Sequence, residues 1–241
     1  MIFPLLSLAV FCILLPCGLA AQTIVATIPL NNTGGPFAVN PATNTIYVAN
    51  TGFGGLSPST VTVLDGTEKI TIATLPVGVE PWAIAVNPVT NIVYVANAGD
   101  GTVTVISGAD NTVTATVTVG VAPWSIAVNP LTNKIYVVNC GADCANDDAP
   151  GSVTVVDGAT NSTTTIPVEF NPRAVAIDPV SDVVYVINCY CARPGREGVG
   201  TVSVIDGATT TVIATLPADL SAHVATVNSA TNSLFVANDI G

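Results

Sequence analysis

Four side chains that could bind a ligand occupy one repeated position of the sequence. Trp82, Trp124, Arg173 and His223 each stand five residues before the Asn or Asp that opens a recurring turn phrase. Two indoles, a guanidinium and an imidazole at one rim would hold an aromatic, sugar-like or anionic ligand. The alternative is that each side chain only covers the end of a neighbouring structural unit. His223 is the only histidine, so it does not by itself define a metal site, and no partner that would orient it as a general base is identified. We predict no metal site, no cofactor and no catalytic residue.

Four cysteines are predicted to form disulfides. They lie in two corresponding loops of the repeat, at Cys140, Cys144, Cys189 and Cys191. An even number of cysteines in an exported chain favours disulfides, for which three connectivities are possible. A four-thiolate zinc site and free thiols are the alternatives, although Cys-x3-Cys with Cys-x-Cys is not a usual zinc spacing.

Two further loop compositions suggest ligands that other features oppose. Asp143, Asp147 and Asp148 form an acidic loop, but their spacing is not that of a calcium site, so we interpret the loop as solvated. Arg193 and Arg196, on the same face as Arg173 and near the two tryptophans, would suit stacking on single-stranded nucleic acid. However, 5 Lys and Arg stand against 16 Asp and Glu, a net charge of −11, and we do not expect a nucleic-acid partner.

A repeat written about five times must position these residues. Its signature is an aliphatic–aromatic–aliphatic–aliphatic–Asn phrase at Ile46–Asn50, Val93–Asn97, Ile135–Asn139, Val184–Asn188 and Leu234–Asn238. An Asn/Asp-Pro phrase (Asn-Ser in the last unit) precedes each aromatic residue by seven positions, and an Asp-Gly or Ser-Gly phrase follows four of the five. The variation in length falls almost wholly between the aromatic and Gly phrases.

Each unit resolves into four short strands. In the second unit they are predicted at 82–86, 92–96, 102–106 and 112–119, with the turn between the first two at Asn87–Asn91. In that turn Pro fixes φ and Asn tolerates a left-handed conformation. The chain is 49% hydrophobic, rich in Val, Ile and Thr, and poor in strong helix formers. Regular four-stranded units of this length are typical of the blades of an all-β β-propeller.

The wording of the repeat resembles the YVTN-repeat β-propeller family of secreted and surface-layer proteins. The resemblance rests on Tyr-Val-Ala-Asn, Thr-Val-Thr-Val-Ile, Ala-Thr-Leu-Pro-Val-Gly and Ala-Val-Asn-Pro, and it covers residues 23–238. It implies the fold strongly and the function weakly, because propellers host many unrelated activities.

The first residues form a separate segment. Residues 1–22 carry no charged side chain, Leu5–Leu15 is apolar, and Gly18-Leu19-Ala20 gives a small-x-small pattern. We predict a signal peptide over 1–21, an exported propeller over 22–241, and no membrane span after cleavage. A lipid anchor at Cys17 and an uncleaved anchor are the alternatives.

The strand count predicts an incomplete ring. Residues 23–30 match the fourth strand of a unit, four complete units follow, and the last unit has only two strands. We therefore expect about five blades of a longer protein, truncated at the C-terminus, because unpaired strand edges are usually covered. An imperfectly closed five-bladed ring is the alternative.

Three functions remain open from the sequence. The first is a non-catalytic, exported binding scaffold. It would bind a protein, glycan or small molecule on the face that carries two kinds of loop, those between the second and third strands of a unit and those between successive units. The second is a lactonase-like hydrolase, for which Glu80, Glu169 and Asp219 are a thin supply of acids. The third is a purely structural surface-layer module. We predict the first.

Overall fold

The computed structural model describes residues 8–9, 27–28, 34–52, 58–142, 150–189, 200–218 and 222–238. In these residues the only regular secondary structure is β-strand, as the composition predicts. The described part of the chain therefore contains no helix that could span a membrane.

Eighteen of the strands make five antiparallel sheets, each formed by strands that follow one another in the chain. The first sheet contains β3 (Gly34–Asn40), β4 (Thr45–Asn50), β5 (Thr60–Asp65) and β6 (Ile70–Pro76). The second contains β7 (Pro81–Asn87), β8 (Ile92–Asn97), β9 (Thr102–Ser107) and β10 (Thr112–Thr118). The third contains β11 (Pro123–Asn129), β12 (Lys134–Asn139), β13 (Pro150–Asp157) and β14 (Thr163–Phe170). The fourth contains β15 (Pro172–Asp178), β16 (Val183–Asn188), β17 (Thr201–Asp206) and β18 (Thr211–Pro217), and the fifth contains β19 (Ala222–Asn228) and β20 (Ser233–Asn238).

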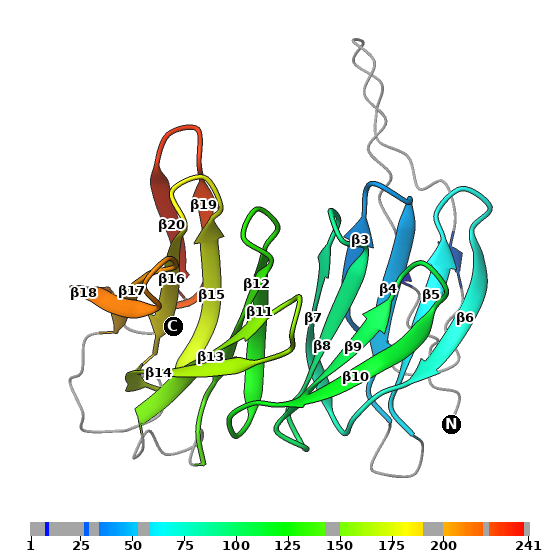
Figure 1. Cartoon of the computed structure of the whole chain (residues 1–241), viewed down its shortest axis with the longest axis horizontal. Helices are drawn as coiled ribbons and strands as arrows, with labels where there is room; N and C mark the ends of the chain where they lie inside the picture. The colour runs from blue at the N-terminus through cyan, green and yellow to red at the C-terminus, as the bar shows by residue number, and fades with distance from the viewer. Residues whose placement is uncertain are drawn as a thin grey trace.

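The sheets stand side by side in an arc (Figure 1). The first strands of successive sheets, β3, β7, β11, β15 and β19, contact one another and therefore line the inner side of the arc. Because every sheet runs up and down, the connections from one sheet to the next share a face with the connections between second and third strands. We call this the loop face. The tight turns between first and second strands lie on the opposite face, the turn face.

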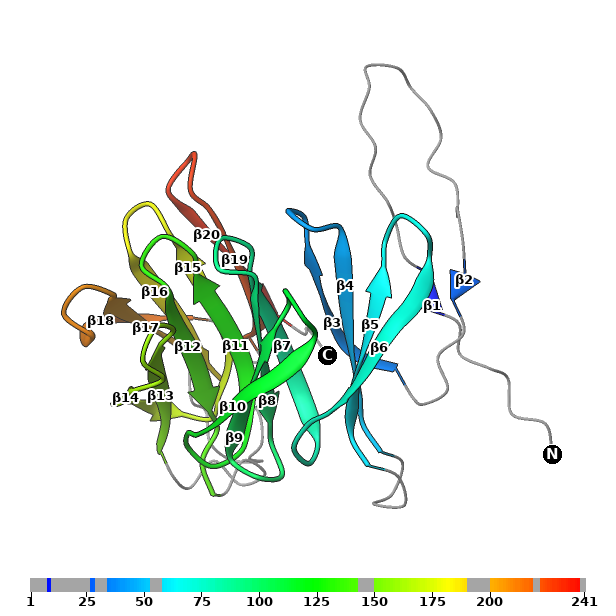
Figure 2. The ribbon, with the colours of Figure 1, turned by 45° about the vertical axis from the view of Figure 1, so that its right-hand side comes forward.

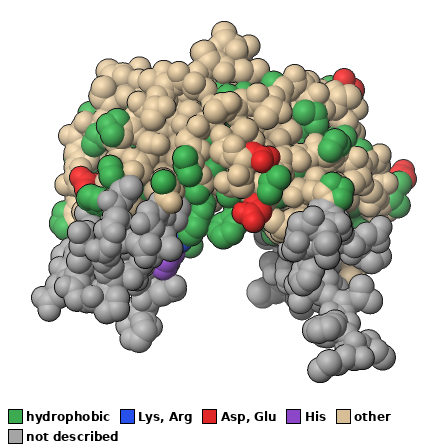
Figure 3. Space-filling model, turned by 90° about the horizontal axis from the view of Figure 1, so that it is seen from below, with side chains coloured by type: hydrophobic (Ala, Val, Ile, Leu, Met, Phe, Trp, Pro, Cys, Tyr) green, Lys and Arg blue, Asp and Glu red, His purple; other side chains and the backbone are tan. Residues whose placement is uncertain are grey.

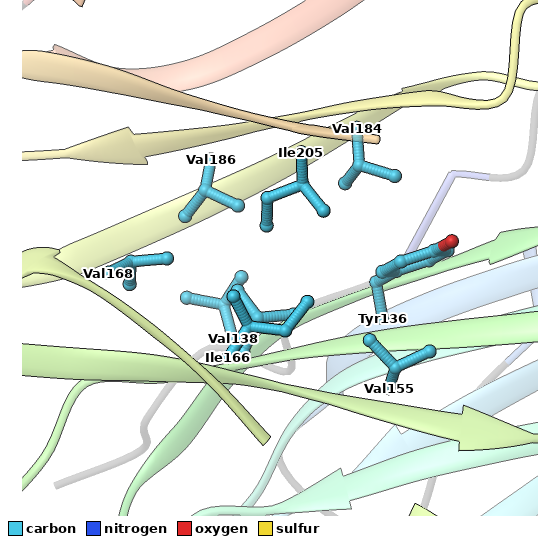
Figure 4. Packing of buried hydrophobic residues seen from close by; sticks show 9 residues of the cluster. Tyr136, Val138, Val155, Ile166, Val168, Val184, Val186 and Ile205 are labelled. Carbon is cyan, nitrogen blue, oxygen red and sulfur yellow. The ribbon is translucent and has the colours of Figure 1, made fainter. Parts of the chain in front are cut away.

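The core lies between sheets rather than within one. Each interface packs the aromatic residue of the second strand of one sheet against aliphatic residues of the next sheet. Tyr136 and Val155, for example, face Val184 and Ile205 across the interface between the third and fourth sheets (Figure 4). The same arrangement surrounds Tyr47 and Tyr94. Val and Thr alternate along the third strands, so Val lies on one face of a sheet and Thr on the other, and both faces are buried between sheets.

Buried asparagines fix the second strand to the third. Asn97 at the end of β8 is fully buried, and its Nδ2 donates to Thr102 Oγ1 at 3.0 Å and to Thr104 Oγ1 at 2.9 Å. Asn50, Asn139 and Asn188 repeat this arrangement with the Thr or Ser residues of their own third strands. The last residue of the aromatic phrase is thus a side-chain clamp inside each sheet.

A second set of polar contacts links neighbouring sheets along the turn face. Asn40 Nδ2 donates to Asn91 Oδ1 at 2.7 Å, Asn87 to Asn133 at 2.7 Å, and Asn129 to Asp182 at 2.6 Å. The acceptors belong to turn residues with positive φ, among them Asn91 at 56°, as the turn phrase predicts. At the next interface the first residue is Asp178, and the pKa of this carboxyl is lowered by hydrogen bonds from Ser181 and from Ser229 of the following sheet.

A short strand pair precedes the first sheet. Residues 23–30 match the fourth strand of a unit in sequence, and of these the structure describes Thr27–Ile28 (β2). This strand pairs with Leu8–Ala9 (β1). This pair lies beside the first sheet, on the side away from β7–β10 (Figure 2). Ile28 packs there against Ile46, Val48 and Leu64, so burial of its side chain favours this position.

Candidate ligand-binding rim

A β-bulge presents each of the four predicted residues. In the pairing of β7 with β8, Pro81 opposes Asn97 and Ala83 opposes Ala96, so Trp82 is the extra residue. Trp124, Arg173 and His223 are the extra residues of β11, β15 and β19 in the same register. A bulge redirects a side chain and sharpens the local twist. The four residues therefore share one position of the fold, which the same bulge in the backbone defines in each inner strand.

The loops that lead into the bulges of β7, β11 and β15 are held in a strained conformation. Glu80, Ala122 and Asn171 have φ of 54°, 51° and 49°, each directly before the Pro that opens the strand. A left-handed conformation costs a residue other than Gly roughly 1–2 kcal/mol. A backbone hydrogen bond offsets that cost, because the carbonyl of Glu80 accepts from Ala98 N at 2.8 Å, and the other two carbonyls accept equivalent bonds. Strain of this kind clusters where a structure must aim a functional group.

Three of the four side chains form a continuous stack. The ring centroids of Trp82 and Trp124 are 5.0 Å apart with an interplanar angle of 25°. The guanidinium carbon of Arg173 lies 3.9 Å from the centroid of Trp124, on a strand on the other side of that indole. Stacked aromatic pairs and cation–π contacts each contribute about 0.5–1.5 kcal/mol. We call Trp82, Trp124 and Arg173 the rim stack.

The rim stack is open to solvent at one end. Trp82 keeps 48% of its surface exposed, whereas Trp124, Arg173 and His223 are half-buried. Figure 3 looks onto the loop face and shows hydrophobic and acidic side chains next to each other on the inner side of the arc. Large exposed aromatic surface is a common feature of binding sites.

The fifth equivalent position escaped the sequence reasoning because its residue has no side chain. Gly35 stands in the bulge of β3, five residues before Asn40. A Cβ atom there would lie 2.9 Å from the backbone oxygen of Ala49, closer than such atoms approach. The spacing to Asn40 would have identified it, but a glycine does not attract notice in a search for reactive groups.

The cysteine prediction is only partly within the described residues. Cys140 and Cys189 follow β12 and β16 and are buried, at the same position of consecutive sheets. Cys140 Sγ lies 3.2 Å from Asn171 Oδ1. Cys144 and Cys191 lie outside the described residues, so the pairing stays a prediction.

Several other predicted residues lie outside the described residues. They are Asp143, Asp147, Asp148, Arg193, Arg196 and Asp219. Glu80 is exposed beside Trp82, and Glu169 is half-buried on β14. Within the described ranges no three His, Cys, Asp or Glu side chains are arranged to hold a metal ion.

No protein-family model matches the chain, and no curated protein does. Solved structures do match it. Hydrazine synthase of Kuenenia stuttgartiensis is 20% identical over 85% of this chain, with a TM-score of 0.66, and the chain spans only 55% of that protein's length. A functionally unknown protein from Desulfotomaculum acetoxidans DSM 771 is 16% identical over 93% of this chain and 71% of its own, with a TM-score of 0.70. The nidogen/laminin complex matches at 12% identity over 86% of this chain and 72% of its own, with a TM-score of 0.58.

At these identities the likeness concerns the fold alone. The chain has the architecture of a β-propeller built from antiparallel four-stranded blades, as predicted. Each four-stranded sheet is one blade, and β3, β7, β11, β15 and β19 are the inner strands.

Proposed function

We propose that this protein is a non-catalytic, exported propeller that binds a protein, glycan or small molecule at the rim of its loop face. The observation that carries the proposal is the rim stack of Trp82, Trp124 and Arg173. His223 extends the same row of bulges to the fifth sheet and belongs to the proposed binding rim.

The rim stack has features that packing alone does not require. The buried aromatic positions of the blades hold Tyr47, Tyr94 and Tyr136, and they already fill the spaces between sheets. The chain has only two tryptophans, and both stand in the rim stack with surface left open to solvent. Tryptophan and arginine are enriched among residues that dominate binding energies. A row of stacked planes held on three neighbouring inner strands is already organised to receive a further planar group.

The finer assignments are parts of the same proposal. We place the chain in the YVTN-repeat family on its repeated phrases, with a signal peptide at 1–21 and the propeller at 22–241. We also propose that Cys140, Cys144, Cys189 and Cys191 pair in disulfides, which the burial of Cys140 and Cys189 and an exported location support.

The double variant Trp82→Ala/Trp124→Ala should lose ligand binding while the propeller stays folded. A mixed library of small molecules and oligosaccharides is screened by ligand-observed NMR against the wild type and the variant. Removing one stacked pair and one cation–π contact should lower the free energy of unfolding by about 1–3 kcal/mol, which leaves a protein of this size folded. We expect compounds that bind the wild type and not the variant. The control is Val89→Ala/Leu131→Ala, which removes exposed apolar side chains from the turn face.

Two results would overturn the proposal. One is a set of binding compounds that is the same for the wild type and the double variant. The other is a double variant that does not fold while the turn-face control does, because the two indoles would then serve the packing of the inner strands.

A further inference from the structure

We infer that the rim stack has one vacant place, over Gly35, and that a neutral sugar ring fills it by stacking on the open face of Trp82. The inference rests on the proposed function, for which it names the class of ligand. It follows from the order of the five equivalent positions, from the exposure of Trp82, and from the charges beside it.

The vacancy is set by the sequence of residues along the inner strands. From β3 to β19 the bulge positions hold Gly35, Trp82, Trp124, Arg173 and His223. β3 contacts β7 as β7 contacts β11, so the first step of the row is built like the second. At the second step two indoles stack, whereas at the first step Trp82 meets a residue without a side chain.

Among the described residues, Gly35 leaves this position of the row without a side chain. A Cβ atom at residue 35 would lie 2.9 Å from the oxygen of Ala49, which belongs to the backbone of β4 and cannot turn away. Any larger residue would therefore shift the strand. Gly35 thus lets β3 and β4 approach each other closely. At the rim it offers no side chain to stack on the second face of the Trp82 indole.

The open face belongs to Trp82. One face of its ring stacks on Trp124, and Trp124 in turn lies between Trp82 and Arg173. The other face is turned away from Trp124, and on that side of β7 the neighbouring inner strand is β3. Trp82 is 48% exposed, whereas Trp124 and Arg173 are half-buried. A ring that stacked there would continue the row by one member.

The charges beside Trp82 select the chemistry of that ring. Glu80 is exposed two residues before Trp82. Asp100 is also exposed, and its Oδ2 accepts a hydrogen bond from Val79 N at 2.6 Å, which holds the carboxylate against the same loop. Two carboxylates at this end of the row, and a net charge of −11, oppose phosphates, sulfates and acidic aromatic compounds.

A neutral sugar satisfies both features at once. Its apolar C–H face covers an exposed indole, and its hydroxyl groups donate to carboxylate oxygens, which only accept hydrogen bonds. A neutral aromatic ring would use the indole but leave the carboxylates without a role. Arg173 is at the far end of the rim stack and does not reach this place, so an anion gains nothing there.

The test uses an array of neutral oligosaccharides, followed by titration of the strongest binder. Tryptophan fluorescence reports the rim alone, because Trp82 and Trp124 are the only tryptophans. We expect saturable binding that weakens about tenfold or more in Trp82→Ala, a few-fold in Trp82→Phe and in Glu80→Gln, and not at all in Leu131→Ala on the turn face. The affinity should also be independent of salt, since the ligand has no charge.

Each failure of the inference is distinguishable. If the array retains no wild-type protein, the sugar assignment is overturned. If only an aromatic compound from the library shows binding that depends on both tryptophans, the sugar is overturned and the binding rim stands. If a sugar binds to Trp82→Ala and to the double tryptophan variant as tightly as to the wild type, both the vacant place and the rim as the binding site are wrong.

Discussion

Replacing Tyr136 with Ala should lower the free energy of unfolding by about 3–5 kcal/mol. Tyr136 is fully buried, and it packs against both its own sheet and the next one, beside Val138, Val155, Val184 and Ile205. Its removal opens a cavity between two rigid sheets that cannot collapse into it. The value is measured by urea denaturation followed by circular dichroism.

Tyr136→Phe is the matched control, and it should change the free energy of unfolding by less than about 1 kcal/mol. The hydroxyl oxygen of Tyr136 is buried and makes no hydrogen bond within the described residues. Burial, together with the carboxylates of Asp182 and Asp206, raises the pKa of this phenol, so it stays uncharged. The fifth blade already has Phe235 at this position. A cost for Tyr136→Phe close to that for Tyr136→Ala would contradict the packing described for this interface.

Replacing Asn97 with Ala should cost about 2–4 kcal/mol, from two lost hydrogen bonds and a small cavity. The clamp of Asn97 on Thr102 and Thr104 is buried, so water does not replace the lost donor. Thermal and urea denaturation measure the change. Thr116→Val, at an exposed position of β10, is the control and should stay within about 0.5 kcal/mol.

A double-mutant cycle shows whether the clamp is the cause. Thr104→Val alone removes the acceptor of the 2.9 Å bond. If Asn97 and Thr104 act through that bond, the double variant should cost less than the sum of the two single changes. Additive costs would mean that Asn97 stabilises the blade by another route.

The strands could be predicted closely from the sequence because local signals agree with one another. The four predicted strands of the second unit differ from β7, β8, β9 and β10 by at most one residue at each end. Turn chemistry set these bounds, with Asn91 taking the left-handed conformation that ends the turn. The alternation of Val with Thr indicated which side chains share one face of a strand, because successive side chains point to opposite faces.

The candidate site could be predicted in position but not in geometry. Equal spacing from the Asn/Asp of the turn phrase located Trp82, Trp124 and Arg173 on one rim. Their stacking depends on bulges that add one residue to each inner strand, and an alternating pattern does not reveal an extra residue. The position of Gly35 was missed because a glycine has no side chain that a search for reactive groups would find.

Long-range pairing was the other limit. The sequence of residues 23–30 favours a strand, but which edge receives it depends on the surfaces available in three dimensions. Ile28 finds burial against the first sheet, beside Leu64, and its backbone pairs with Leu8–Ala9. Strand propensity carries no information about that choice.

The stacking of Trp82 on Trp124 is the central claim, and far-UV circular dichroism tests it most directly. Two indoles 5.0 Å apart couple electronically, so the wild-type spectrum should contain an exciton couplet in the indole region. Trp82→Phe and Trp124→Phe should each abolish the couplet, while Val89→Ala on the turn face should keep it. A wild-type spectrum without a couplet, or a couplet that survives either tryptophan replacement, would contradict the stacked rim and the binding site built on it.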